Sequence, residues 1–262
     1  VAINENDLDS VYNLGLSLIK LGFEDDGLRY LSRASELSED SEIAHSIGNV
    51  FYKTGDYKSS SFFLMKAYQK DKTNPELIKT LAISLFQDGD TARAVHLMRG
   101  HLLRFPSNEN YRTIFSEVIN KYAEEDFSEG TKKALEICLT QDNVKYRNFA
   151  LAWCATFITD PSFEFLRQFP TSAETNEDEF FKILKTPFLC LGLQRNITSS
   201  SPTELIFTHV RRYLTSHWQN YVSWPKGVLQ FLSSLAVQCW YNDFIYFETT
   251  EEKENLKKLF VH

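Results

Sequence analysis

The chain has 262 residues, 43% of them apolar, which is enough for one or two domains with a sizeable hydrophobic core. Its formal net charge of −7 argues against a general nucleic-acid binder, because binding phosphates requires a basic surface. The ten glycines are scattered, and neither GxGxxG nor GxxxxGKS/T, the loops that cradle phosphates, is present. The sequence therefore predicts no cofactor and no nucleic-acid partner.

The sequence shows no sign of export or of a membrane anchor. No apolar run reaches the roughly 18 residues of a membrane span, and the first ten residues lack the features of a signal peptide. The cysteines Cys138, Cys154, Cys190 and Cys239 lie in apolar runs without CxxC pairing, which is typical of reduced, buried thiols. We therefore expect a cytoplasmic protein without membrane contact. The missing initiator Met and the helical pattern at the last residues suggest a piece of a longer chain.

The first hundred residues contain a repeat with a period of 33 to 34 residues. It is carried by five columns of matched residues: Gly22, Gly55 and Gly89; Leu14, Ile47 and Leu81; Gly15, Gly48 and Ala82; Gly27, Ser60 and Ala94; Leu31, Leu64 and Met98. Each unit reads as two amphipathic helices joined at the glycine of the first column, which suits a left-handed helix end. Small residues in the third and fourth columns allow the two helices to approach closely. We expect repeats at residues 8–40, 41–74 and 75–108.

The second unit carries the most complete version of a known pattern. Its residues, in order, are Gly48, Tyr52, Gly55, Ser60, Leu64 and Ala67. They resemble the tetratricopeptide repeat (TPR), and Pro106 stands where the third repeat would end. Val11 and Ala44 replace the tryptophan of the consensus. The resemblance implies a solenoid of helical hairpins that binds a peptide or protein surface in a concave groove lined by the first helices.

The resemblance also assigns groove positions, four in each repeat. They are Tyr12, Leu16, Ile19 and Lys20; His45, Asn49, Tyr52 and Lys53; and Lys79, Ile83, Phe86 and Gln87. The alternative is that some of these side chains pack against a later helix. In chaperone-binding TPR proteins, Lys and Asn clamp a terminal carboxylate, but the clamp positions here hold Tyr12, Leu16, Ser46, Glu76 and Thr80. Chaperone-tail binding is therefore not expected.

The periodic glycine pattern does not continue clearly after residue 108. An apolar stripe from Tyr111 to Tyr122 and a second one from Ala134 to Cys138 predict another helix pair. This pair is either a degenerate fourth repeat or a cap on the apolar end of the solenoid. We assign residues 1–140 to the TPR array and residues 141–262 to a second helical region, which would either cap the array or link it to a further domain.

Proline and capping residues divide the second half into further helices. Residues 146–158 are ended by Pro161, and residues 180–193 contain Pro187 at a kink or a start. Ser201 is the expected cap of a helix that has Pro202 at its first position and runs to about Trp218. Pro225 opens the next helix, and Thr250 caps a last one that reaches Phe260. No segment alternates as a strand would, so the sequence predicts an all-α fold.

The segment 231–252 carries a second resemblance. The matching residues are Phe231, Leu235, Ala236, Gln238, Cys239, Asn242, Asp243, Thr250, Glu251 and Glu252. They are similar to a string in the helical region that precedes the catalytic domain of bacterial TPR-containing class I S-adenosylmethionine-dependent methyltransferases. The resemblance implies that this chain is the non-catalytic, substrate-recruiting N-terminal part of such an enzyme. Whether the full-length protein is an enzyme stays open.

No constellation in the chain indicates catalysis or metal binding. The spacings between His96 and His101 and between His209 and His217 do not suit shared ligation of one ion. The acidic clusters at 25–26, 124–126 and 177–179 read as turns and helix starts. We expect no catalytic residue and no metal site, and a protein or peptide as partner. Self-assembly through exposed helix faces is a further hypothesis, and the oligomeric state stays open.

Overall fold

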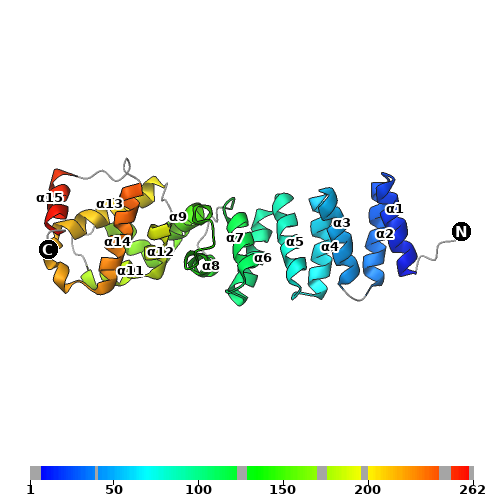
Figure 1. Cartoon of the computed structure of the whole chain (residues 1–262), viewed down its shortest axis with the longest axis horizontal. Helices are drawn as coiled ribbons and strands as arrows, with labels where there is room; N and C mark the ends of the chain where they lie inside the picture. The colour runs from blue at the N-terminus through cyan, green and yellow to red at the C-terminus, as the bar shows by residue number, and fades with distance from the viewer. Residues whose placement is uncertain are drawn as a thin grey trace. The chain divides into compact units, whose positions relative to one another are not determined.

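The computed structural model describes residues 7–38, 41–122, 129–169, 176–195, 200–241 and 249–259. Within these ranges the chain is built of helices and no residue lies in a β-strand (Figure 1), which confirms the all-α prediction. The chain divides into two compact units, Val1–Met98 and Arg99–His262. No helix in the described ranges combines the length and the apolar character that crossing a lipid bilayer requires.

The first unit consists of helix–turn–helix pairs. Its helices are α1 (Leu8–Lys20), α2 (Glu24–Leu37), α3 (Glu42–Thr54), α4 (Tyr57–Lys70), α5 (Pro75–Gln87) and the first part of α6 (Thr91–Arg104). Figure 1 shows α1 beside α2 and α3 beside α4, and each pair is in close contact. Successive pairs also touch, since α2 contacts both α3 and α4, and α5 contacts both α3 and α4. The helical hairpins expected from the repeat are therefore present.

Glycine ends the first helix of each hairpin in the same way. Gly22, Gly55 and Gly89 have φ angles of 85°, 84° and 91°, and no other described residue has a positive φ. Each turn is closed by the same backbone hydrogen bond, donated by the residue after the glycine to a carbonyl five positions back: Phe23 to Leu18, Asp56 to Phe51, and Asp90 to Leu85. This is the Schellman pattern that a left-handed glycine allows. The periodic glycines are thus explained by backbone geometry.

Small residues let the two helices of a hairpin approach closely. A Cβ atom added at Gly48 would lie 2.5 Å from Cγ of Leu64, and one added at Gly15 would lie 2.7 Å from Cγ of Leu31. The two pairs occupy equivalent positions, so the first two hairpins pack in one register. In the second hairpin Ser60 adds a buried hydrogen bond, in which its hydroxyl donates to the carbonyl of Gly48 at 2.9 Å.

The second unit contains shorter helices around an aromatic core. They are α7 (Glu109–Ile119), α8 (Glu129–Leu139), η1 (Tyr146–Phe149), α9 (Ala150–Thr159), η2 (Pro161–Phe163), α10 (Glu164–Gln168), α11 (Glu177–Leu184), α12 (Pro187–Arg195), α13 (Ser201–Ser216), η4 (Trp218–Ser223), α14 (Lys226–Tyr241) and α15 (Thr250–Leu259). Trp153 is fully buried, and its ring stacks on Phe157, Phe188 and Phe207 at centroid distances of 5.6 to 6.2 Å. Its Nε1 donates to the carbonyl of Phe188 at 3.0 Å, which satisfies the buried indole.

Two predicted helix starts are wrong by one residue. Ser200, not Ser201, is the N-cap residue of α13, so Pro202 takes its second position. Proline is tolerated there because the first N–H groups of a helix have no intrahelical partner. Thr249, not Thr250, caps α15: its hydroxyl accepts from the N–H of Glu252 at 3.1 Å, and the carboxylate of Glu252 accepts from the N–H of Thr249 at 2.9 Å. This capping box requires an acid three residues after the cap, which Thr250 lacks.

Candidate binding face

The residues that the TPR resemblance places in a groove lie on the first helices of the three hairpins, α1, α3 and α5. They form four columns across these helices: Tyr12, His45 and Lys79; Leu16, Asn49 and Ile83; Ile19, Tyr52 and Phe86; Lys20, Lys53 and Gln87. Within each helix the spacing of three and four residues keeps these side chains on one face. None of the twelve is buried. We call this set the first-helix face.

Part of the first-helix face also belongs to the core of the unit. Tyr12, Leu16 and Ile19 are half-buried and pack against a cluster of buried side chains on the next helices. The cluster consists of Leu31, Ile47, Phe51 and Phe63, with the rings of Phe51 and Phe63 stacked at 5.7 Å. On α1, the expected groove residues therefore help to hold the hairpins together, as the packing alternative predicts for some of them. Their remaining surface is apolar.

The middle helix of the face carries a histidine held in its neutral form. Burial lowers the pKa of His45, and this effect outweighs the opposing influence of the carboxylates of Glu76, Asp71 and Glu42. Its Nε2 atom is buried and has no hydrogen-bond partner among the described residues. An imidazolium there would lose its hydration without gaining a partner. His45 is therefore uncharged at neutral pH and adds an aromatic surface between the carboxylates and the apolar core.

Hydrogen-bonding groups with no partner within the unit lie beside this apolar surface. Asn49 is half-buried, and its side-chain amide makes no hydrogen bond in the part of the chain that the structure describes. Lys20 and Lys53 are exposed, without an ion pair in the same ranges, and lie in the last turns of α1 and α3, where the helix dipole favours a positive charge. Lys79 differs from them, since its Nζ lies 3.6 Å from the carboxylate of Glu76.

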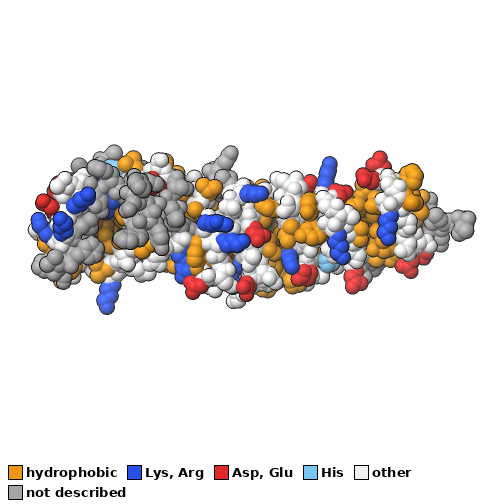
Figure 2. All heavy atoms as spheres, turned by 45° about the horizontal axis from the view of Figure 1, so that its top comes forward, with side chains coloured by type: hydrophobic (Ala, Val, Ile, Leu, Met, Phe, Trp, Pro, Cys, Tyr) orange, Lys and Arg blue, Asp and Glu red, His pale blue; other side chains and the backbone are white. Residues whose placement is uncertain are grey.

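The face combines half-buried apolar and aromatic side chains, one free amide and two free ammonium groups. An Asn amide can pair with a peptide group of an extended partner, and exposed lysines attract carboxylates. The surface drawn in Figure 2 mixes apolar, acidic and basic side chains and has no large area of one charge among the described atoms.

The described thiols are mostly buried, and the described acidic clusters lie at helix starts. None of the four cysteines forms a disulfide among the described residues: Cys138, Cys154 and Cys190 are buried as expected, whereas Cys239 is only half-buried. Burial raises the pKa of the Cys138 thiol to about 12, so it stays protonated. In the described ranges no three His, Cys, Asp or Glu side chains are placed to hold a metal ion. The acidic cluster at 124–126 lies outside the described residues.

Arg211, whose role could not be read from the sequence, holds together the segment 231–252 that resembles the methyltransferase-associated string. Arg211 on α13 is buried, and its Nε donates to Oε1 of Glu252 at 3.0 Å, while a guanidinium nitrogen lies 3.5 Å from Sγ of Cys239. Arg212 reaches the other carboxylate oxygen at 3.3 Å, and Gln238 donates to the carbonyl of Leu193. The string thus joins α12, α13, α14 and α15. Two of its matched positions, 242 and 243, lie outside the described residues.

Comparison with models of known protein families gives no match, and no curated protein matches the sequence. The functional interpretation therefore depends on the geometry of the first-helix face and on the residues of the second unit.

Proposed function

We propose that the first unit is a TPR-type protein-binding module whose partner lies across α1, α3 and α5. The observation that carries this proposal is the shared geometry of the hairpins. The three glycine turns have the same left-handed conformation and the same closing hydrogen bond, and the first two hairpins share one close glycine–leucine contact. Hairpins that pack in one register present equivalent side chains to a common surface, which is how repeat proteins build an extended binding site.

The free groups of the first-helix face define the chemistry of the partner. The Asn49 amide pairs with a backbone peptide group, and the ammonium groups of Lys20 and Lys53 pair with carboxylates. Tyr52, whose ring meets Tyr57 edge-on at 5.9 Å, provides an aromatic contact surface beside them. An extended segment with acidic side chains fits these groups best. The burial of three of the four cysteines supports reduced thiols and a reducing compartment, so we place the module in the cytoplasm.

The experiment compares two double variants that lose the same side chains from different surfaces. Partners retained by the wild-type chain are identified by mass spectrometry, and their affinity is then measured with purified components. Asn49→Ala with Tyr52→Ala should weaken binding by at least tenfold with an unchanged melting temperature. The control, Asn13→Ala with Tyr30→Ala, removes an Asn and a Tyr outside the four columns and should bind like the wild type. Equal affinity of both variants would contradict the proposal.

A second candidate function is recruitment of substrate as the non-catalytic part of an S-adenosylmethionine-dependent methyltransferase. It is favoured by the network around Arg211, which gives matched residues of the string, Cys239 and Glu252, a structural role in joining helices. A region that links a binding array to a catalytic domain needs such a rigid connection. The coding sequence after His262 tests this candidate, since it should continue into a glycine-rich cofactor loop. A stop codon directly after His262 would exclude it.

A further inference from the structure

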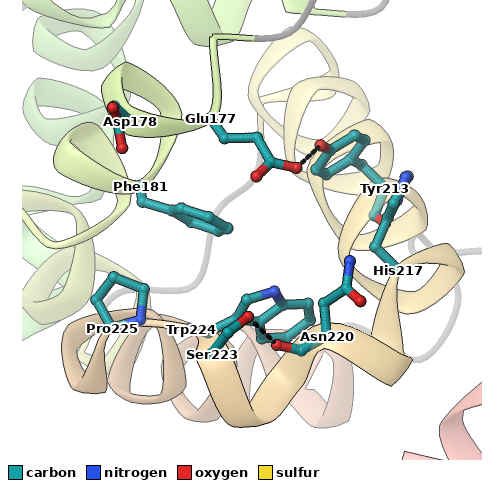
Figure 3. Close-up of a pocket in the computed structure, with 9 residues that line it drawn as sticks. All are labelled: Glu177, Asp178, Phe181, Tyr213, His217, Asn220, Ser223, Trp224 and Pro225. Carbon is teal, nitrogen blue, oxygen red and sulfur yellow. Dashed lines mark hydrogen bonds between the residues drawn. The ribbon is translucent and has the colours of Figure 1, made fainter.

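A cavity of about 250 Å³ opens in the second unit (Figure 3). It lies where the start of α11, the end of α13, η4 and the residues before α14 meet. It is lined by Glu177, Asp178, Phe181, Tyr213, His217, Asn220, Ser223, Trp224 and Pro225. The volume is far above the roughly 30 Å³ of a water molecule and just below that of pockets for drug-sized ligands, so it suits a small head group.

Aromatic rings form the walls of this cavity on two sides. The ring of Phe181 points into it in Figure 3, and the ring of Trp224 lies next to it at a centroid distance of 6.4 Å and an angle of 48°. Trp224 is only 8% exposed, so its ring is fixed by its surroundings. On the other side the rings of Tyr213 and His217 lie at a centroid distance of 4.3 Å and are tilted by 31°, and Nδ1–H of His217 donates to the carbonyl of Tyr213 at 2.8 Å. Contacts within the protein therefore hold these walls in place.

The charge of the lining is negative. Glu177 and Asp178 contribute carboxylates, and among the described residues no Lys or Arg lines the cavity. The hydroxyl of Tyr213 donates to Oε1 of Glu177 at 3.2 Å and draws this carboxylate across the cavity mouth toward α13. In the described part of the chain, the other oxygen of Glu177 has no hydrogen bond and no ion pair. The helix dipole favours acidic residues in the first turn of α11, but it does not explain why these acids lie beside the rings of Phe181 and Trp224.

We propose that this cavity binds an alkylated ammonium group, with the cation against the rings of Phe181 and Trp224 and with Glu177 as its counter-charge. Aromatic faces attract cations within about 6 Å of the ring centroid, and a nearby carboxylate adds a direct charge interaction. A quaternary ammonium group donates no hydrogen bonds, so an aromatic wall satisfies it as well as water does. The group arrives either on a small molecule or on a methylated lysine of a peptide. This proposal does not depend on the function of the first-helix face.

Calorimetric titration of the whole 262-residue chain with choline tests the charge requirement. The control ligand is 3,3-dimethylbutan-1-ol, which has the same shape without the charge. Choline should bind at least tenfold more tightly than the alcohol. A peptide with one trimethyllysine, compared with its unmethylated form, identifies the source: stronger binding of the peptide than of choline assigns the site to proteins, and the reverse assigns it to small molecules. If neither cation binds, or the alcohol binds equally well, the proposal is wrong.

Matched variants locate the binding. Glu177→Gln removes the counter-charge and Phe181→Leu removes one wall, and each should weaken choline binding by about five- to tenfold. Glu179→Gln removes the same charge from the same helical turn, but Glu179 does not line the cavity, so binding should stay unchanged. Melting temperatures confirm that the variants are folded. An equal loss in Glu177→Gln and Glu179→Gln would show a general charge effect and would overturn the assignment of this cavity.

Discussion

The exchange of Gly48 for alanine tests the packing register on which the repeat interpretation depends. An alanine Cβ there would lie 2.5 Å from Cγ and 2.7 Å from Cδ2 of Leu64, far inside van der Waals contact. The backbone N of Leu64 is 3.2 Å away, and the Leu64 side chain is fully buried, so neither can move without disturbing the core. The two helices of the hairpin must therefore separate, or Leu64 must leave its rotamer.

Two opposing contributions set the change in the free energy of unfolding that Gly48→Ala causes. Replacing glycine by alanine inside a helix stabilises it by about 1 kcal/mol where nothing is in the way. Inserting a methyl group into a packed core costs about 1–3 kcal/mol. Gly48→Ala should therefore range from neutral to about 2 kcal/mol destabilising. Gly100, in the helix interior of α6, has no atom within 4 Å of an added Cβ, so Gly100→Ala should stabilise by about 1 kcal/mol.

Urea unfolding followed by circular dichroism measures both changes, and the helix-propensity term cancels in their difference. We expect Gly48→Ala to be less stable than Gly100→Ala by about 1–3 kcal/mol. Leu64→Ala provides the second test, because it removes Cγ and Cδ2. In that background the cost of Gly48→Ala should fall by at least about 1 kcal/mol. If both glycine variants are stabilised equally, or if the Leu64 background changes nothing, the close contact between α3 and α4 does not exist.

Three further predictions concern the second unit. Gly192→Ala would place Cβ against Nε1 of the buried Trp153, far inside van der Waals contact, so urea unfolding should show a loss of about 2 kcal/mol after the helix-propensity gain, and an unchanged stability would contradict this packing. Glu252→Gln leaves Arg211 buried without its counter-charge and should cost about 3–5 kcal/mol at pH 7. Burial alone would raise the pKa of Glu252, but the hydrogen bonds from Thr249 and Arg211 lower it. The stability contributed by the Glu252–Arg211 ion pair is therefore present above the ordinary carboxyl pKa and is lost as the pH falls through the lowered pKa of Glu252. A wild-type advantage that does not shrink on acidification would disprove the role of the ion pair. Burial raises the pKa of Glu204, so the wild type loses stability as the pH rises above the ordinary carboxyl pKa. Glu204→Gln should therefore be more stable than the wild type at pH 7 but not at pH 4. Equal unfolding midpoints of the variant and the wild type at both pH values would contradict a buried Glu204 with a raised pKa.

The hairpins of the first unit could be predicted because their signals are local. A left-handed turn needs glycine at one position, and a close helix contact needs a small residue at another, so both leave a periodic mark in the sequence. Gly55 and Gly48 show the two requirements in one repeat, with a φ of 84° at the first and the contact with Leu64 at the second. The same locality explains the error at α15. The acid three residues after Thr249 was visible, and the capping-box rule would have chosen the right threonine.

The contacts of the second unit leave no such mark, because they join residues that are far apart in the sequence. Arg211 and Glu252 are separated by 41 positions, and an adjacent pair of arginines carries no information about which acid it will meet. The cavity is a clearer case of contacts that cannot be predicted from local sequence. Glu177 opens one helix and Tyr213 closes another, 36 positions later, and each side chain alone is ordinary for its place. Only the fold brings a carboxylate, two aromatic walls and a fixed tryptophan together. For this reason the first-helix face follows from a repeated pattern, whereas the cation site follows from tertiary structure alone.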